Sequence, residues 1–297
     1  MANYQVPEKA RVAVLTGAKK IEIFELPVPE IGDDEVLVKV EQTGICGTDV
    51  HEYKGDPFGY IPVELGHEGT GTVVKLGKNV KTDYYGKPLA VGDKIVTGLK
   101  PCGVCDTCKN DPEHVHLCPN GEIFGLMPGE AAYKNFNGWF GEYIKVNKGG
   151  VIFNVSDMDV DLRALIEPTA VIVHAVEQTP AEIAFVLPNN KNIVMAAMQA
   201  AEIADRNVIV IPSKTVPQGI SAMLTFDPEG TVEDNTEAMN EALSAVVTGQ
   251  VTFAARDSDF DGFKIRKDDL MAMENGKIVF TDTDIENCAV KLCSKMA

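Results

Sequence analysis

The sequence predicts two parts of different architecture: a mainly β part first, and an α/β layer after it. Three observations support this prediction. Glycines punctuate short β segments between residues 36 and 96, and four cysteines lie close together at 102–118. From residue 181 onward, apolar strand patterns alternate with segments of helical spacing.

In the first part, residues 36–40 alternate apolar and polar side chains, as a half-buried strand does. The second part is expected to hold strands at 181–187 and 207–212, helices at 192–204, 217–226 and 231–247, and β segments at 250–255, 263–265 and 277–280. Thr231 begins a capping-box pattern, which marks the start of the last of these helices.

Composition and charge narrow the classes of partner. The chain has 297 residues, enough for two domains, with 45% hydrophobic and 24% charged residues. A net charge of −17 would repel a phosphate backbone or an anionic membrane, so neither is expected as a partner. No apolar run approaches the roughly 20 residues needed to cross a bilayer. Residues 1–10 lack the apolar segment of an export signal, and we expect a cytoplasmic protein.

The strongest chemical signal is a polar loop with the spacing C-x2-C-x2-C-x9-C, formed by Cys102, Cys105, Cys108 and Cys118. Thiolates repel one another unless a cation lies among them, and four on one loop can surround a tetrahedral Zn²⁺. The alternatives are two disulfides or unrelated thiols, but chain size and the lack of an export signal argue against disulfides. Four thiolates fill the zinc shell, so the predicted site is structural.

A second constellation lies upstream, where Cys46 and the pair His67-Glu68 offer a thiolate, an imidazole and a carboxylate. Each is a ligand type that zinc accepts. A catalytic zinc uses about three protein ligands and keeps one position open for water or substrate. The sequence therefore predicts a catalytic-type zinc site.

Three side chains that follow Cys46 suit supporting roles. Thr48 and His51 can carry a proton toward solvent, because a hydroxyl both donates and accepts and an imidazole titrates near neutrality. Asp49 can orient the imidazole of His67.

Residues 1–177 resemble the GroES-like catalytic domain of the zinc-dependent medium-chain alcohol dehydrogenases, close to the polyol (sorbitol) and threonine dehydrogenase branch. Besides the thiol loop, the motifs that carry the resemblance, in family order, are GICGTDVH (Gly44–His51), LGHEGTGTVVKLG (Leu65–Gly77), VGDKIV (Val91–Val96), GWFGEYIKV (Gly138–Val146) and LIEPTAVIVHAV (Leu165–Val176). The resemblance implies a mainly β GroES-like barrel.

The resemblance also implies site residues and cofactors. Cys46, His67 and Glu68 would hold the catalytic zinc, and Glu167 would be a near or alternating ligand. Two zinc ions per chain, an NAD(P) coenzyme and a small alcohol or polyol substrate are expected, and a homo-oligomer is compatible with the family. The family's thiol loop has seven residues before its fourth cysteine, whereas this one has nine. They include His116, which is an alternative ligand to Cys118.

The dinucleotide fingerprint of that family is missing after residue 177. A Rossmann domain would begin there with G-x-G-x-x-G, but Gly219, Gly230, Gly249, Gly262 and Gly276 form no G-x-G. We therefore predict no Rossmann fingerprint and no recognisable NAD(P) grip in this chain.

Residues 179–285 resemble instead the C-terminal region of the large polypeptide of bacterial fatty-acid kinase, which is dihydroxyacetone-kinase-like. The motifs are FVLPNNKNIVMAA (Phe185–Ala197), IPSKTVPQG (Ile211–Gly219) and TGQVTFAARDSDFDG (Thr248–Gly262). The chain thus reads as a chimera with domains 1–178 and 179–297. Three function classes stay open: a zinc-dependent alcohol or polyol dehydrogenase of doubtful activity, a non-catalytic binding module, and a zinc-stabilised chimera without activity.

Overall fold

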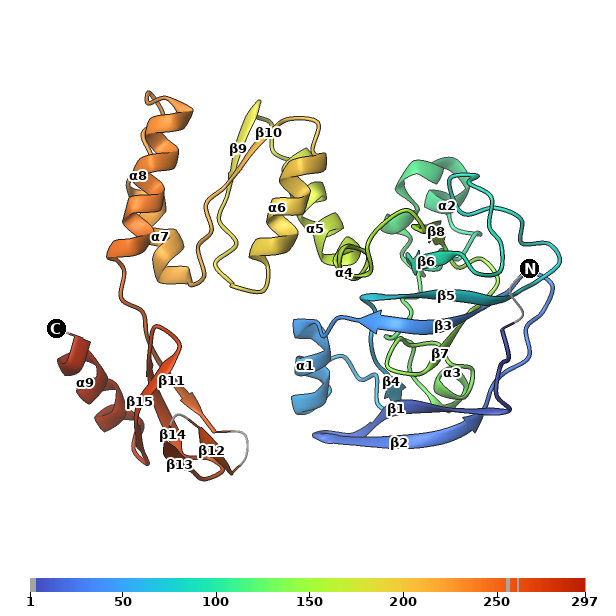
Figure 1. Cartoon of the computed structure of the whole chain (residues 1–297), viewed down its shortest axis with the longest axis horizontal. Coiled ribbons are helices and arrows are strands. Elements are labelled where there is room, and N and C mark those ends of the chain that lie inside the picture. The colour runs from blue at the N-terminus through green and yellow to red at the C-terminus, as the bar shows by residue number, and fades with distance from the viewer. Residues whose placement is uncertain (1–3, 255–256, 261, 297) are drawn as a thin grey trace. The chain divides into compact units, whose positions relative to one another are not determined.

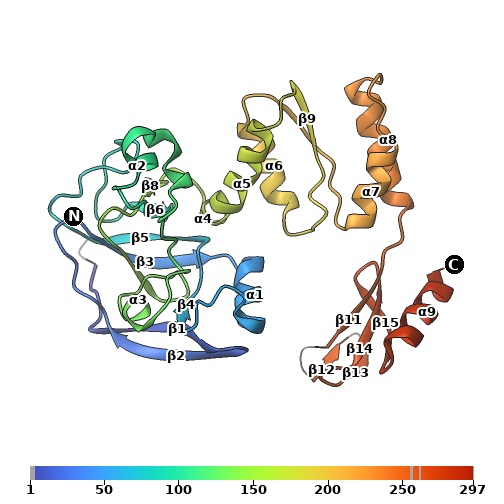
Figure 2. The ribbon, with the colours of Figure 1, turned by 180° about the vertical axis from the view of Figure 1, so that it is seen from behind.

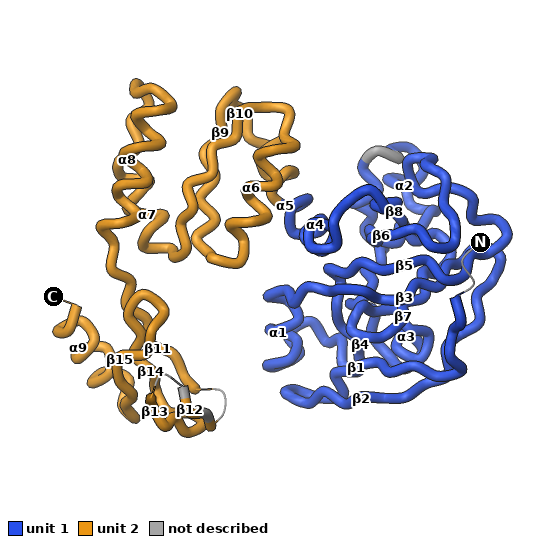
Figure 3. Tube along the Cα trace, viewed as in Figure 1, with its two compact units in different colours: residues 1–171 blue, residues 172–297 orange. Residues whose placement is uncertain are grey.

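The computed structural model describes residues 4–254, 257–260 and 262–296, and it divides the chain into two compact units, residues 1–171 and 172–297 (Figure 3). The division falls inside helix α5 (Ile166–Glu177). The domain boundary after residue 178 stays a prediction about where the two sequence segments meet. No helix in the described part of the chain is long and apolar enough to span a membrane.

The first unit is built on two antiparallel sheets (Figure 1). The larger sheet has the order β7-β3-β5-β6-β8 and the smaller one β2-β1-β4. The strands are β1 (Lys9–Gly17), β2 (Lys20–Pro27), β3 (Val36–Thr43), β4 (Val63–Glu64), β5 (Gly69–Leu76), β6 (Lys94–Thr97), β7 (Tyr143–Val146) and β8 (Ile152–Asn154). The prediction that the N-terminal part is mainly β is confirmed.

The first three residues of β3 are buried on both faces because their alternate side chains enter different clusters. Val36 and Val38 pack in a cluster around Trp139, whereas Leu37 joins a second cluster with Val12 of β1. The second cluster lies between the two sheets. Trp139 is fully buried and lies so close to β5 that a Cβ on Gly69 would come within 2.1 Å of its indole ring.

Short helices connect these strands. They are α1 (Gly47–Gly55), α2 (Asp106–Asn110), the 3₁₀ helix η1 (Pro112–Leu117), α3 (Glu130–Lys134) and α4 (Val160–Ala164). Helix α1 follows β3 after three residues, and Cys46 is its N-cap residue. Leu165 alone separates α4 from α5. Residues 44–46 and 165–167 therefore lie at junctions that the sheet and the helices fix from both sides.

After the end of α5, the second unit continues with a strand–helix–strand motif. Its strands β9 (Ile183–Val186) and β10 (Asn207–Val210) pair in parallel, with α6 (Val194–Ile203) between them in the chain. Helices α7 (Val216–Leu224) and α8 (Val232–Ala245) follow, and Thr231 caps α8 by accepting the Asp234 N–H, as its capping-box pattern predicts. The strands and helices predicted at 181–247 are thus observed, with ends that differ by a few residues.

The chain then forms an antiparallel sheet of order β11-β14-β15, covered by the last helix (Figure 2). The elements are β11 (Gly249–Phe253), β12 (Ser258–Phe260), β13 (Phe263–Ile265), β14 (Leu270–Glu274), β15 (Lys277–Asp282) and α9 (Ile285–Met296). The sequence analysis predicts neither β14 nor α9. Helix α9 packs Cys288 and Leu292 against Leu270 and Ala272 of β14. Most of its other side chains are exposed.

Candidate metal centres

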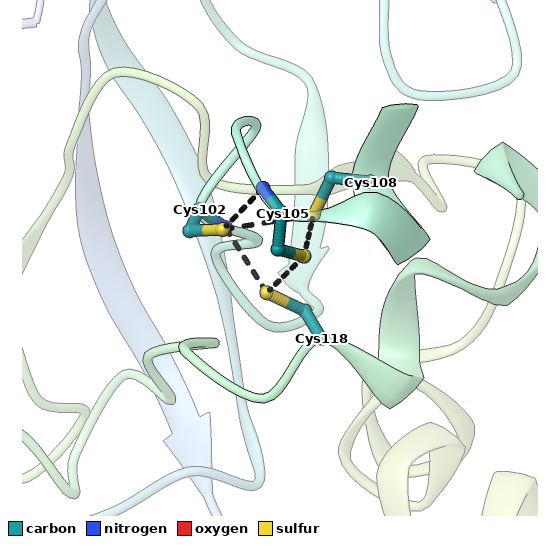
Figure 4. Close-up of side chains that lie close together, drawn as sticks. All are labelled: Cys102, Cys105, Cys108 and Cys118. Carbon is teal, nitrogen blue, oxygen red and sulfur yellow. Dashed lines mark hydrogen bonds between the residues drawn. The ribbon is translucent and has the colours of Figure 1, made fainter. Parts of the chain in front are cut away.

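The four thiols of the polar loop come together as predicted. Their sulfur atoms turn toward one another (Figure 4). The Sγ–Sγ separations are 3.4 Å for Cys105–Cys108, 3.7 Å for Cys105–Cys118 and 3.9 Å for Cys102–Cys108. A regular tetrahedron with Zn–S bonds of about 2.3 Å places its sulfurs about 3.8 Å apart. The cluster therefore has the size of a zinc tetrathiolate.

Backbone groups prepare this loop for thiolates. The Cys105 N–H points at the Cys102 Sγ at 3.4 Å, and the Cys102 N–H points at the Cys118 Sγ at the same distance. Backbone hydrogen bonds from Val104 and Cys105 lower the pKa of the Cys102 thiol to about 6. Burial among the other sulfurs raises the pKa of Cys108 to about 12. The pKa values of Cys102 and Cys108 thus shift in opposite directions, as expected for neighbouring thiols that cannot all ionise without a cation.

The alternative ligand His116 is not part of the cluster. Its side chain is exposed, and its ring lies 5.6 Å, centroid to centroid, from that of His114. Cys118, at the end of η1, supplies the fourth sulfur instead. The two extra residues of the loop are thus taken up by η1, with both histidines on the surface.

The second predicted constellation also assembles. One ligand atom from each of Cys46, His67 and Glu68 lies within 4.8 Å of the others, and all three residues are partly buried. We call these three residues the trio. Cys46 comes from the β3–α1 junction, whereas the other two come from the loop between β4 and β5. The fold therefore joins segments that are about 20 residues apart, at the ligand count that a catalytic zinc uses.

A close backbone approach makes this junction. The Gly44 N–H donates to the carbonyl oxygen of Glu68 at 2.8 Å, which extends the pairing of β3 with β5. A Cβ on Gly44 would lie 2.2 Å from the Glu68 Oε2. Only glycine leaves room for the carboxylate beside Cys46.

Asp49 ties the two ligand segments together. Its buried carboxylate accepts the Cys46 N–H at 2.8 Å through Oδ2 and the Gly66 N–H at 3.3 Å through Oδ1. Its Oδ1 lies 3.7 Å from the His67 Nδ1, and that nitrogen is buried without a hydrogen-bond partner among the described residues. Asp49 thus lies on the Nδ1 side of the His67 imidazole, where the sequence predicts that it orients this ring.

The donor set of the trio fits a cation. Burial raises the pKa of the Cys46 thiol and that of the Glu68 carboxyl. Both groups therefore favour their neutral forms unless a positive charge lies between them. The trio, the orphaned Nδ1 of His67 and these raised pKa values together describe a pocket that would accept a divalent metal ion.

The remaining predicted site residues lie at different distances from the trio. The Cys46 thiol donates to the Thr48 hydroxyl at 3.7 Å. His51 is exposed on α1, and no hydrogen bond or ion pair joins it to the trio in the described part of the chain. Burial raises the pKa of Glu167, and this carboxyl also interacts electrostatically with His67 and Glu68, so it faces the trio without belonging to the 4.8 Å group.

Sequence reasoning missed two charged residues beside this site. Glu41 on β3 and Arg163 on α4 form an ion pair of 3.1 Å, and Arg163 is only 6% exposed. Neither belongs to a motif that signals a ligand. The only sequence clue is their spacing, since each lies four or five residues before a candidate ligand.

Two family models match the chain. Residues 32–157 match the alcohol dehydrogenase GroES-like domain, and residues 165–297 match the C-terminal region of the FakA-like family of fatty acid kinases. Each match covers less than half of the chain. Together they account for both segments that the sequence analysis describes.

Curated relatives match part of this chain at 45–48% identity. An uncharacterised protein of Staphylococcus epidermidis is 45% identical over 275 residues, which is 92% of this chain and 44% of that protein. Protein YloV of Bacillus subtilis is 48% identical over 125 residues, 42% of this chain and 23% of that protein. The chain therefore spans less than half the length of these relatives.

Solved structures of dehydrogenases resemble about two thirds of this chain. An alcohol dehydrogenase of Thermotoga maritima is 28% identical with a TM-score of 0.60, covering 68% of this chain and 57% of that one. A putative zinc-binding dehydrogenase of Sinorhizobium meliloti, bound to NADP, is 28% identical with a TM-score of 0.53 (69% and 56%). Galactitol-1-phosphate dehydrogenase of Escherichia coli is 25% identical with a TM-score of 0.54 (67% and 55%).

These matches support a dehydrogenase-like relationship for the N-terminal segment. The chain thus matches the alcohol dehydrogenase GroES-like domain over residues 32–157 and the FakA-like C-terminal region over residues 165–297.

Proposed function

We propose that this chain is a zinc-binding protein of the alcohol/polyol dehydrogenase class, with one catalytic-type and one structural zinc. A single observation carries the proposal: a thiolate, an imidazole and a carboxylate from two separate segments lie within 4.8 Å of one another. The thiol loop, with sulfurs spaced like a zinc tetrathiolate, would hold the structural ion.

In the proposed site, Cys46, His67 and Glu68 hold the metal, and Asp49 holds the two ligand segments together. When bound, zinc supplies Lewis acidity that polarises the oxygen of a small alcohol or polyol. The Thr48 hydroxyl, next to the Cys46 sulfur, can take up and pass on a proton. His51, exposed on the same helix, can exchange that proton with water.

Glu167 is proposed as a near or alternating ligand. Its carboxyl lies within electrostatic reach of the trio but outside the 4.8 Å group. A carboxylate held at such a distance can replace a departing ligand or stay apart from the metal.

Hydride transfer needs a nicotinamide held against the substrate carbon. A coenzyme is expected from the relationship, and the Sinorhizobium meliloti relative binds NADP. In this chain, however, the strand that follows the GroES-like segment leads into Pro188-Asn189-Asn190, with no G-x-G-x-x-G. The Asn189 side chain is bound to the buried Ser213, whose hydroxyl donates a hydrogen bond to the Asn189 Oδ1 at 2.8 Å. We therefore propose that turnover by this chain is weak or undetectable.

The decisive test is a nicotinamide titration of the purified, zinc-replete chain, together with elemental analysis. We expect two zinc ions per chain, and little NAD(P)H formation with sorbitol, threonine or a simple alcohol. One zinc or none would contradict the two-site assignment. Saturable, robust alcohol oxidation would contradict the proposed weak turnover.

A second candidate function is favoured by the relatives. Two of them are 45% and 48% identical to this chain over 125 residues, and the FakA-like family model matches residues 165–297. We propose as the alternative that the chain is a non-catalytic, zinc-stabilised binding module. Metal content of two with no nicotinamide binding at any concentration would favour this alternative.

A further inference from the structure

We propose that Arg163 is a positioning residue for the metal centre: the ion pair between its buried guanidinium and Glu41 holds α4 against β3 and so sets the place of Glu167 beside the trio. This inference rests on the proposed function, because it presupposes a metal ion at Cys46, His67 and Glu68.

The ion pair between Arg163 and Glu41 takes the Arg163 guanidinium out of water, which costs free energy. Arg163 is 6% exposed, and its Nη1 lies 3.1 Å from the Glu41 Oε2. The approach is an ion pair without good hydrogen-bond geometry, because the Nε and Nη1 atoms are buried with no hydrogen-bond partner among the described residues. Desolvating a guanidinium against one carboxylate gains little stability compared with apolar packing. Such a pair is better explained by what it positions.

Glu41 is fixed from the opposite side by the sheet. Lys94 of β6 donates to the Glu41 Oε1, and the Thr72 hydroxyl of β5 donates to the same oxygen at 2.5 Å. Although partial burial opposes ionisation, these hydrogen bonds keep the pKa of Glu41 below its usual value. The Glu41 carboxylate is therefore charged, and its hydrogen bonds connect β3 with β5 and β6.

Both partners of the pair lead directly to candidate ligands. Glu41 lies on β3, five residues before Cys46, and Arg163 lies on α4, four residues before Glu167. Leu165 alone separates α4 from α5, so a shift of α4 is passed on to the first turn of α5. One ion pair thus clamps the two chain segments that carry Cys46 and Glu167.

Two further contacts show how α4 is held. The Asp159 side chain caps the helix by accepting the Asp161 N–H at 2.9 Å, and the Gln42 amide donates to the Asp161 Oδ1 at 3.2 Å. Both lie on the exposed side of the helix. The Arg163–Glu41 pair joins the buried side chain of α4 to the strand that leads to Cys46.

A double-mutant cycle tests this role, because a residue that acts only through Glu167 loses its effect when Glu167 is changed. The variants are Arg163→Met, Glu167→Gln and the double variant, each compared with wild type for Co²⁺ affinity at the trio by chelator competition. We expect each single change to weaken affinity about tenfold, as for other residues that orient metal ligands. The double variant should be no weaker than Glu167→Gln, and both single changes should alter the cobalt absorption bands in the same way.

Lys145→Met is the matched control. It breaks a partly buried ion pair, Lys145–Glu35 at 3.0 Å, in the same domain but at the end of β3 that lies away from Cys46. We expect it to lower the urea midpoint, followed by the fluorescence of Trp139, without changing the cobalt affinity by more than about twofold. If Arg163→Met does not fold, Arg163→Lys replaces it in the cycle, with an intermediate loss of affinity expected.

Additive losses in the double variant, or wild-type cobalt affinity in a folded Arg163 variant, would overturn the positioning role while leaving the metal centre intact. A wild-type chain that binds cobalt only at the thiol loop would overturn the metal centre, and the positioning role with it. The two failures are therefore distinguishable in the same experiment.

Discussion

The two candidate metal centres of the N-terminal unit are built in opposite ways. The thiol loop takes all four ligands from residues 102–118, and no residue of this stretch belongs to a hydrophobic cluster of the described chain. The trio takes its ligands from two distant segments that the sheet, Gly44 and Asp49 hold together. We therefore expect the loop to depend on a bound metal ion for its structure, and the trio to depend on the fold for the placement of its ligands.

This comparison predicts its largest effect for Cys105→Ser. A loop without a hydrophobic core of its own folds around its zinc, so the free energy of zinc binding contributes directly to folding. In isolated zinc-finger peptides this free energy is roughly 10 kcal/mol or more. We expect the variant to lose the loop zinc and to destabilise the unit by a fraction of that, about 3–5 kcal/mol. Urea unfolding followed by Trp139, the only tryptophan of the chain, reports on this unit alone.

Cys293→Ser is the matched control, because Cys293 is an exposed free thiol on α9. It should keep both zinc ions and the wild-type urea midpoint. A Cys105→Ser protein with one zinc but unchanged stability would show that the loop holds its shape without metal, and the contrast between the two centres would disappear.

Cys46→Ser should have a large effect on metal and a small one on fold. We expect zinc content to fall from two per chain to one, with affinity at the trio at least about 100-fold weaker, because a hydroxyl is a much poorer zinc ligand than a thiolate. The unfolding free energy should change by less than about 1 kcal/mol, since β3 and α1 are held by their own contacts. Elemental analysis and urea unfolding measure both. Loss of both zinc ions would show that the centres are coupled.

The contrast also explains what the sequence could predict. The thiol loop is local, so its spacing alone indicates a tetrahedral site, and the structure places all four sulfurs as that spacing requires. The trio was predicted because Cys46, His67 and Glu68 are zinc ligand types in the number that a catalytic zinc uses, and the family motifs around them supported that prediction. Its distances depend on the pairing of β3 with β5, which no local pattern encodes.

Other features could not be predicted for related physical reasons. Glu41 and Arg163 meet across more than a hundred residues, and neither carries a ligand pattern. Helix α9 was missed although its apolar residues follow helical spacing, with Cys288 and Leu292 four residues apart on its buried face. Domain boundaries at 178/179 and the roles of the site residues stay predictions, since the compact units divide within α5.

Gly44→Ala should damage the trio without touching the loop. The added Cβ would lie 2.2 Å from the Glu68 Oε2, so the carboxylate must leave its place beside Cys46. We expect about a tenfold loss of cobalt affinity at the trio, as for other changes beside metal ligands. Gly55→Ala is the control, because no atom lies within 4 Å of the position of its added Cβ. Equal affinities in the two variants would show that Glu68 does not need its present position.

The smallest predicted effect is a pH dependence from Glu64, a buried carboxyl on β4. Its Oε2 accepts the Gly138 N–H at 3.1 Å, and its Oε1 is buried without a partner among the described residues. Burial raises the pKa of Glu64 well above the usual value. The folded state therefore binds this proton more tightly than the unfolded chain, whose glutamate pKa is about 4.3. Its contribution to stability is full below about pH 4 and is lost as pH rises through the folded pKa.

Glu64→Gln tests this sign, because glutamine stays neutral and still accepts from Gly138. The stability difference between variant and wild type should grow in favour of the variant as pH rises from about 4 to 8, to about 1 kcal/mol for each unit of pKa shift. Glu142→Gln should do the opposite, since hydrogen bonds from Arg11 lower the pKa of Glu142 and its contribution is lost as pH falls. Urea midpoints from Trp139 fluorescence decide the matter. Parallel pH curves for Glu64→Gln and wild type would mean that the Glu64 carboxyl reaches solvent in the folded state. The surroundings of Glu64 would then accept a charge with no greater loss of stability than the exposed thiol loop does.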